Sequence, residues 1–153
     1  MNKPVRILVV DCGNMGTSHA RAYHELKDFE ITGLVSRSEE SRNRLSDALG
    51  GYPTFSSLQE ALDNSEADAV SINTYPDTHA EFSIHAMRQG CHVFMEKPIA
   101  STVEQAEEVA RAVKETKKKM VVGYILRHHP AWRKFVEMAQ TLGKPLIMRM
   151  NLN

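Results

Sequence analysis

Short apolar runs alternate with segments of helical periodicity along the chain, and this alternation limits the folds that the chain can adopt. Runs typical of strands lie at residues 6–10, 30–35, 52–55, 69–72, 92–95 and 120–124. Between them, apolar residues recur every three or four positions, as they do in amphipathic helices. Strict alternation favours right-handed βαβ units. We therefore expect an α/β fold with a doubly wound parallel sheet that is covered by helices on both faces.

Local signals place several helix boundaries. Ser57 is followed three residues later by Glu60, and Thr78 by Glu81, so both match the capping-box pattern and predict a helix start. A last amphipathic helix is expected over residues 132–142, with Trp132 in the apolar core. Residues 144–153 are expected to begin a further strand.

Composition excludes several classes of function. The 153 residues contain 19 Lys and Arg and 19 Asp and Glu, and this balance argues against nucleic acid or an anionic membrane as the partner. No apolar stretch approaches the roughly 20 residues that a membrane span requires. The first residues do not resemble a signal peptide, so we expect a cytoplasmic protein.

Cysteine and histidine spacing predicts no metal site. Cys12 and Cys91 lie far apart and match no zinc-ligand spacing, so both are expected to be buried thiols in a reducing compartment. His128 and His129 are adjacent rather than four residues apart on a helix.

The turn after the first strand carries part of a phosphate-binding pattern. Parallel sheets bind ligands beyond the carboxyl ends of their strands. Gly13 and Gly16 match the second and third glycines of GxGxxG, which allow the backbone to approach a pyrophosphate and the helix to pack on the strand. Asp11 replaces the first glycine, and it brings a side chain and a negative charge near the expected phosphates.

The ends of the other strands carry further polar residues. Ser36 and Arg37 follow the second strand, where a hydroxyl followed by an arginine suits the 2′-phosphate of NADP better than the 2′-hydroxyl of NAD. Asn73 and Thr74 follow the fourth strand. Lys97 follows the fifth, where its amine is suited to hold a substrate hydroxyl or carbonyl and to share its proton.

Four motifs occur in the order and spacing of a known family. They are Cys12-Gly13-Asn14-Met15-Gly16 with His19, Thr74-x-Pro76-x-x-His79, Glu96-Lys97-Pro98, and Gly123-Tyr124-x-x-Arg127-x-x-Pro130. The chain resembles the Gfo/Idh/MocA family, the relatives of glucose–fructose oxidoreductase and inositol dehydrogenase. The resemblance implies an NAD(P)-binding Rossmann domain over residues 1–125. It also implies that residues 126–153 form the final helix and first strand that lead to a second domain.

The resemblance assigns roles to individual residues. It implies cofactor binding, with NAD or NADP, by Gly13, Asn14, Met15, Gly16, Ser36, Arg37, Asn73, Thr74, Pro76, His79, Glu96, Lys97 and Arg127. Lys97 is the catalytic residue that it implies, in hydride transfer to or from a polyol, sugar or related hydroxyl or carbonyl compound. The full-length enzyme is expected to be a homo-oligomer, and residues 1–153 alone are expected to bind cofactor weakly and to be inactive.

Two alternatives remain open. A non-catalytic nucleotide-binding module is favoured by Asp11 and by the missing second domain. The spacing Asp11-x-Gly13-x-x-Gly16 also resembles an S-adenosylmethionine-dependent methyltransferase, although Met15 stands where such a turn has glycine. As a strand without its sheet, residues 145–150 are expected to be disordered or to form a dimer contact.

Overall fold

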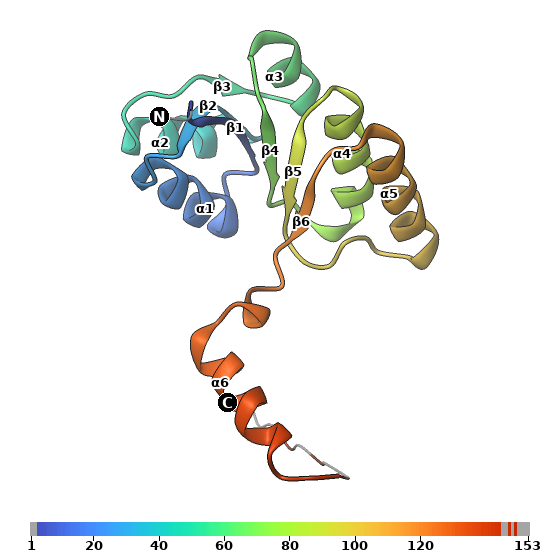
Figure 1. The fold of residues 1–153 in the computed structure, drawn as a ribbon. Coiled ribbons are helices and arrows are strands. Elements are labelled where there is room, and N and C mark those ends of the chain that lie inside the picture. The colour runs from blue at the N-terminus through green and yellow to red at the C-terminus, as the bar shows by residue number, and fades with distance from the viewer. Residues whose placement is uncertain (1–2, 145–146, 148, 150–153) are drawn as a thin grey trace. The chain divides into compact units, whose positions relative to one another are not determined.

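The predicted alternation of strands and helices is present through Gly123. The computed structural model describes residues 3–144, 147 and 149, and it divides into one unit that ends at Gly123 and another that begins at Tyr124. The strands of the first unit are β1 (Val5–Val10), β2 (Phe29–Val35), β3 (Thr54–Phe55), β4 (Ala69–Ile72), β5 (His92–Met95) and β6 (Met120–Val122). Its helices are α1 (Asn14–Glu25), α2 (Glu39–Ala48), α3 (Leu58–Asn64), α4 (Pro76–Arg88) and α5 (Val103–Thr116) (Figure 1).

All six strands form one parallel sheet. Their order is β3-β2-β1-β4-β5-β6, and each neighbouring pair is parallel. The chain progresses from β1 to one edge and then returns to add β4 on the other side of β1. This reversal confirms the predicted doubly wound α/β fold, and it leaves a crevice beyond the carboxyl ends of β1 and β4, where such folds bind ligands.

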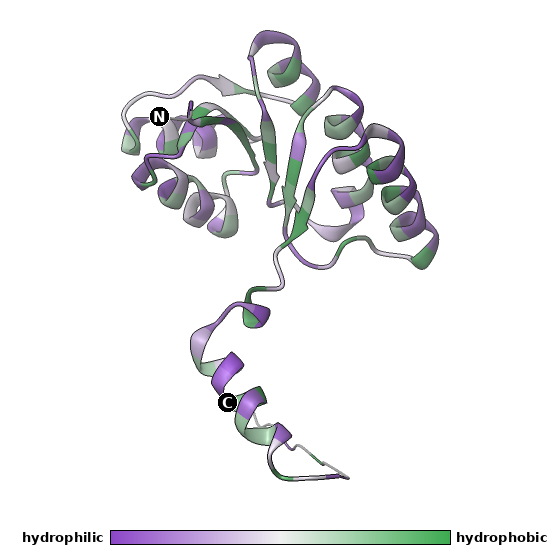
Figure 2. Cartoon of the chain, in the orientation of Figure 1, coloured by the Kyte–Doolittle hydropathy of each residue, from purple (hydrophilic) through white to green (hydrophobic). Residues whose placement is uncertain are grey.

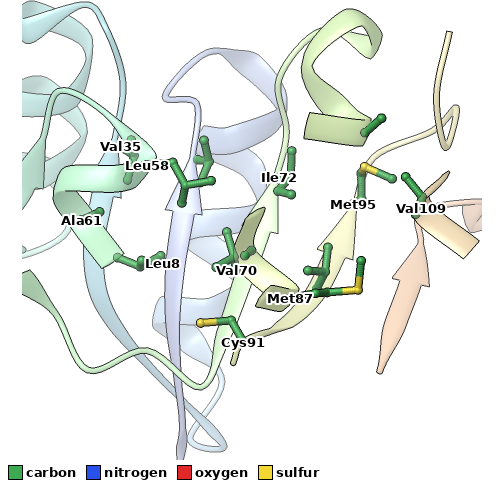
Figure 3. Packing of buried hydrophobic residues seen from close by; sticks show 14 of the residues in the cluster. Leu8, Val35, Leu58, Ala61, Val70, Ile72, Met87, Cys91, Met95 and Val109 are labelled. Atoms are coloured by element: carbon green, nitrogen blue, oxygen red, sulfur yellow. The ribbon is translucent and has the colours of Figure 1, made fainter. Parts of the chain in front are cut away.

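The continuous apolar run of β1 is explained by burial on both of its faces. Leu8 and Val10 belong to a cluster that α3, α4 and α5 complete (Figure 3). Ile7 and Val9 belong to a second cluster that α1 and α2 complete. Hydrophobic residues accordingly fill β1 from Ile7 to Val10, whereas hydrophobic and hydrophilic residues alternate around α5 (Figure 2). A strand that is buried on both sides has no polar face, as expected in a parallel sheet.

One of the two predicted capping boxes is correct and the other is wrong. The Ser57 hydroxyl accepts the N–H of Glu60 over 3.2 Å at the start of α3, while the Glu60 carboxylate accepts the N–H of Ser56. Helix α4 begins at Pro76 and not after Thr78, because proline suits the first turn of a helix. The Thr78 hydroxyl therefore lies inside this turn and donates to Thr74 Oγ1 over 2.7 Å.

The second unit contains a short 3₁₀ helix, η1 (Ile125–Arg127), and α6 (Pro130–Gln140). Trp132 stacks on Phe135 of the same helix, with ring centroids 5.4 Å apart. The expected burial of Trp132 in the core is wrong, because no residue of α6 is buried in the described structure. Most of the strand predicted at 144–153 lies outside the described residues.

None of the helices in the described part of the chain combines the length and the apolar character that crossing a membrane requires.

Candidate functional site

The turn between β1 and α1 brings the helix very close to the strand. A Cβ atom on Gly16 would lie 1.8 Å from the backbone oxygen of Asp11, so only glycine fits this position. Gly13 is the N-cap of α1, and no side chain caps this end of the helix. The free N–H groups of the first turn, with the positive end of the helix dipole, are therefore available to an anion. Asn14 and Met15 are exposed in the same turn.

Asp11 changes the electrostatics of this turn. It has a positive φ of 78°, a conformation that glycine adopts more readily. Its Oδ2 atom accepts the backbone N–H of Gly13 over 3.2 Å. Burial, and secondarily the negative charge of Asp11, raises the pKa of the neighbouring Cys12 thiol to about 11. Cys12 and Cys91 are both buried, as the sequence predicted, and Cys12 is therefore a thiol rather than a reactive thiolate near neutral pH.

A groove opens beyond the carboxyl ends of β1, β2 and β4. Its volume is about 650 Å³, which lies in the range that is usual for small-molecule sites. Among the residues predicted from the sequence, it is lined by Gly13, Ser36, Arg37 and Thr74. Residues that follow three different strands thus meet at one site, as the strand-end rule predicts.

Arg37 supplies the positive charge of the groove. It is the one arginine or lysine among the lining residues, which all belong to the described structure, and they also include the acids Asp11, Asp77 and Glu81. The Arg42 guanidinium donates to the backbone oxygen of Ser36 over 3.1 Å, which fixes the loop that carries Arg37. Arg37 and the free N–H groups of α1 fit an anionic cofactor, whereas the Asp11 carboxylate does not.

The segment Glu96-Lys97-Pro98, which we call the 96–98 loop, is held by two histidines. Glu96 is 7% exposed, and its Oε1 atom lies 2.9 Å from Nε2 of His19. Its Oε2 atom accepts the backbone N–H of Lys97 over 3.2 Å. His79 is fully buried, with Nδ1 2.6 Å from the backbone oxygen of Pro98 and Nε2 2.9 Å from that of Thr74. The loop is thereby tied to α1 and α4, and Lys97 itself is exposed.

Several predicted residues lie elsewhere than beside the groove. Glu96 and Lys97 follow β5, one strand beyond β4, and do not line it. Asn73 is buried, and its amide donates inward to the backbone oxygens of Val10 and Ser71, so it joins the tips of β1 and β4 instead of facing a ligand. Pro76 serves as the first residue of α4. Arg127 belongs to the second unit, where its guanidinium lies 5.7 Å from the centroid of the Tyr124 ring.

One face of α4 lines the groove, and its residues were not predicted from the sequence as part of the site. Thr78, Glu81, Phe82 and His85 all contribute to the lining. Their spacing of three, four and seven residues places them on one side of a helix, directly after the predicted Thr74 segment, and this is the signal that would have found them. Nε2 of His85 is buried and has no hydrogen-bond partner in the described part of the chain.

Comparison with known families separates the two ligands considered for the turn between β1 and α1, a nicotinamide dinucleotide and S-adenosylmethionine. The family model described as "Oxidoreductase family, NAD-binding Rossmann fold" matches residues 5–124. The chain belongs to the Gfo/Idh/MocA family. Membership confirms the resemblance seen in the four motifs, and it favours a nicotinamide dinucleotide over S-adenosylmethionine as the ligand of the glycine turn. The described fold is that of the NAD-binding Rossmann domain of a Gfo/Idh/MocA protein.

Individual Gfo/Idh/MocA proteins cover this chain almost completely. Myo-inositol 2-dehydrogenase of Thermotoga maritima is 28% identical over 151 residues, which are 95% of this chain and 44% of the relative. A 3-ketoreductase from Actinomadura kijaniata, solved with TDP-benzene and NADP, superposes with a TM-score of 0.83 and 26% identity over 91% of this chain and 44% of that structure.

A scyllo-inositol dehydrogenase from Lactobacillus casei, solved with NAD(H) and scyllo-inositol, shares the fold with a TM-score of 0.85. It is 22% identical, over 91% of this chain and 42% of that structure. Residues 1–153 span less than half the length of the curated relatives that they match.

Proposed function

We propose that residues 1–153 are the cofactor-binding part of an oxidoreductase that transfers a hydride between a nicotinamide and a polyol, sugar or related substrate. The observation that carries this proposal is the groove, which brings Gly13, Arg37 and Thr74 together beyond the carboxyl ends of β1, β2 and β4. The substrate class follows the names of relatives, which include myo-inositol 2-dehydrogenase and D-glucoside 3-dehydrogenase.

Each part of the groove has a proposed task. The free N–H groups at the start of α1 bind the pyrophosphate. The loop at Ser36 and Arg37 binds the adenosine ribose, and the Arg37 guanidinium favours the 2′-phosphate of NADP over the hydroxyl of NAD. NADP is therefore the preferred cofactor in this proposal.

Lys97 is the proposed catalytic residue. The bound nicotinamide supplies or accepts the hydride. In the oxidation direction, the neutral Lys97 amine accepts the proton of the substrate hydroxyl while the C–H bond of the same carbon breaks. In the reduction direction, the ammonium returns that proton to the carbonyl oxygen. Glu96 positions Lys97 by accepting its backbone N–H. The remaining substrate contacts are assigned to the part of the relatives that this chain does not match.

Calorimetric titration of residues 1–153 with NADPH and with NADH tests the proposal. We expect saturable binding of both, tighter for NADPH. A titration with S-adenosylmethionine is the control and is expected to give no binding. No heat with either dinucleotide at millimolar concentration would contradict the proposed cofactor site.

A second candidate is a nucleotide-binding module without catalysis. The specific observation in its favour is the hydrogen bond from Gly13 N–H to the Asp11 carboxylate, which occupies a donor that a pyrophosphate would use. The titration separates the two candidates when it is repeated with ADP. A module that senses the adenine half binds ADP as tightly as the dinucleotide, whereas the proposed oxidoreductase domain binds the dinucleotide more tightly.

A further inference from the structure

The 96–98 loop is held on each side of Lys97 by a different histidine. His19 contacts the Glu96 side chain on the residue before Lys97, and His79 contacts the Pro98 backbone oxygen on the residue after it. Lys97 itself is exposed, while the residues directly before and after it are both held by hydrogen bonds.

The two histidines reach the loop from opposite faces of the sheet. His19 lies on α1, which packs with α2 on one face, and His79 lies on α4, which packs with α3 and α5 on the other. His19 also packs against Phe94 of β5, with ring centroids 5.0 Å apart. Displacement of the loop toward either face is therefore opposed by a contact from a different helix.

Each histidine also belongs to a helix that begins at the candidate site. His19 lies five residues after the Asn14 start of α1, which carries the proposed pyrophosphate donors. The second ring nitrogen of His79 faces the backbone oxygen of Thr74, which lines the groove. A neutral imidazole carries one N–H, so the His79 ring makes one of its two hydrogen bonds at a time unless both nitrogens are protonated.

We propose that His19 and His79 are positioning residues that fix the 96–98 loop, and with it Lys97, relative to the two helix ends that border the groove. In this role they act through the 96–98 loop and not through contact with the substrate or the reacting atoms. This inference rests on the proposed function, because it assigns the loop to the nicotinamide half of the dinucleotide. Loss of either histidine is expected to weaken binding of that half and to spare the adenine half.

The first measurement tests how well the 96–98 loop is ordered, and it needs no ligand. Hydrogen–deuterium exchange of peptides that cover residues 96–100 should be faster by about tenfold in His19→Ala and in His79→Ala, because each change removes a partly buried hydrogen bond to the loop. Exchange in β1 should stay within about twofold of the unaltered chain, since its burial does not depend on either contact. His19→Gln, whose amide is able to donate to Glu96, should restore slow exchange.

His24→Ala is the matched control on α1. The His24 ring contacts the Tyr52 hydroxyl and makes no described hydrogen bond to the 96–98 loop. Exchange at 96–100 should not change in this variant. Equal acceleration in His24→Ala and His19→Ala would overturn the proposal, because it would reveal general loosening of α1. Unchanged exchange in His19→Ala and His79→Ala would overturn it as well.

The second measurement compares NADPH with adenosine 2′,5′-bisphosphate, which lacks the nicotinamide half. We expect His19→Ala and His79→Ala to weaken NADPH binding by about fivefold or more and to change bisphosphate binding by less than about twofold. Parallel weakening of both ligands would overturn the proposed positioning role. If the unaltered chain binds neither ligand, the proposed function fails, and the exchange experiment alone decides whether the histidines fix the loop.

Discussion

The carboxylate of Asp11 accepts the backbone N–H of Gly13 over 3.2 Å, within the turn that other Rossmann domains use to bind pyrophosphate. A phosphate oxygen and this carboxylate compete for the same donor, and their negative charges repel each other. Asp11 also has a positive φ of 78° at this turn, a conformation that glycine adopts more readily. Binding of a dinucleotide therefore requires the Asp11 side chain to turn away.

Asp11→Gly should tighten dinucleotide binding by about fivefold or more, because one negative charge a few ångströms from a phosphate costs on the order of 1 kcal/mol even in a well-solvated site. Thermal stability should change little, since relief at the positive φ offsets the greater chain entropy of glycine in the unfolded state. Calorimetry with NADPH measures the change. Asp11→Asn retains the side chain without its charge and separates the two contributions. Unchanged affinity for NADPH in both variants would show that the Asp11 side chain does not weaken dinucleotide binding.

Gly16→Ala should destabilise the first unit by at least about 2 kcal/mol, because the added methyl group collides with backbone that cannot move independently. The approach of 1.8 Å to the Asp11 oxygen requires α1 or the end of β1 to shift. Urea unfolding followed by circular dichroism measures the loss. Ser18→Ala, an exposed change on the same helix, is the control and should stay within about 0.5 kcal/mol. A Gly16→Ala variant as stable as this control would contradict the close packing.

Arg37→Ala should weaken NADPH binding by about tenfold or more and leave NADH binding nearly unchanged, because a guanidinium–phosphate pair is a strong charge-assisted interaction. Arg44→Ala removes an exposed arginine of α2 that does not line the groove, and it controls for the loss of general positive charge. Equal losses for both cofactors would place Arg37 near a group that NAD and NADP share.

Lys97→Ala in the full-length enzyme should lower turnover by at least about 100-fold, the usual contribution of a proton-transferring group, with a far smaller effect on cofactor affinity. Lys97→Arg preserves the positive charge but does not release a proton near neutral pH, so it should be almost as inactive. Steady-state kinetics and cofactor titration of the same samples separate the two effects. Nearly full turnover in Lys97→Arg would show that charge alone is needed.

Acid should weaken the contact between β1 and the loop before β4. Hydrogen bonds from Arg6 to Asp68 lower the pKa of the Asp68 carboxyl to about 2 from its ordinary value near 3.8. A carboxyl whose pKa is depressed on folding stabilises the protein above its unfolded-state pKa, and this contribution is lost as the pH falls from about 4 to about 2. Because the Asp68 side chain is 43% exposed, the contribution is about 1 kcal/mol or less.

Asp68→Asn tests this pH dependence. The variant should unfold at a lower temperature than the unaltered chain near neutral pH, and the two melting temperatures should converge as the pH approaches about 2. Thermal unfolding followed by circular dichroism over this pH range gives the comparison. A difference that stays constant with pH would show that the carboxylate charge of Asp68 is not what stabilises the contact.

Elements that depend on local pattern and burial were predictable from the sequence. The apolar run from Ile7 to Val10 predicted a strand, and its four residues are all buried, on both faces of the sheet. The placement of Ser36 and Thr74 beside one groove followed from topology alone, since the carboxyl ends of parallel strands share one edge of the sheet.

Features that depend on the direction of a single side chain, or on the exact residue at which a helix begins, were not predictable from the sequence. The Asn73 amide turns inward and donates to the backbone oxygens of Val10 and Ser71, and no sequence pattern records this side-chain direction. Thr78 satisfies the spacing of a capping box equally well as a first-turn residue, and Pro76 decides the start of the helix. The positive φ of Asp11 and the hydrogen bond from Gly13 N–H to its carboxylate are likewise not recorded by any sequence pattern.

Burial of both native thiols makes the chain convenient for site-specific labelling. Burial raises the pKa of Cys12 and of Cys91, so neither presents a thiolate to a maleimide reagent at neutral pH. A cysteine introduced at an exposed position such as Ser18 would then react selectively, with no need to replace the native pair. A fluorophore attached there, on the first helix, would report ligand-induced changes at the adjoining turn as a change in emission.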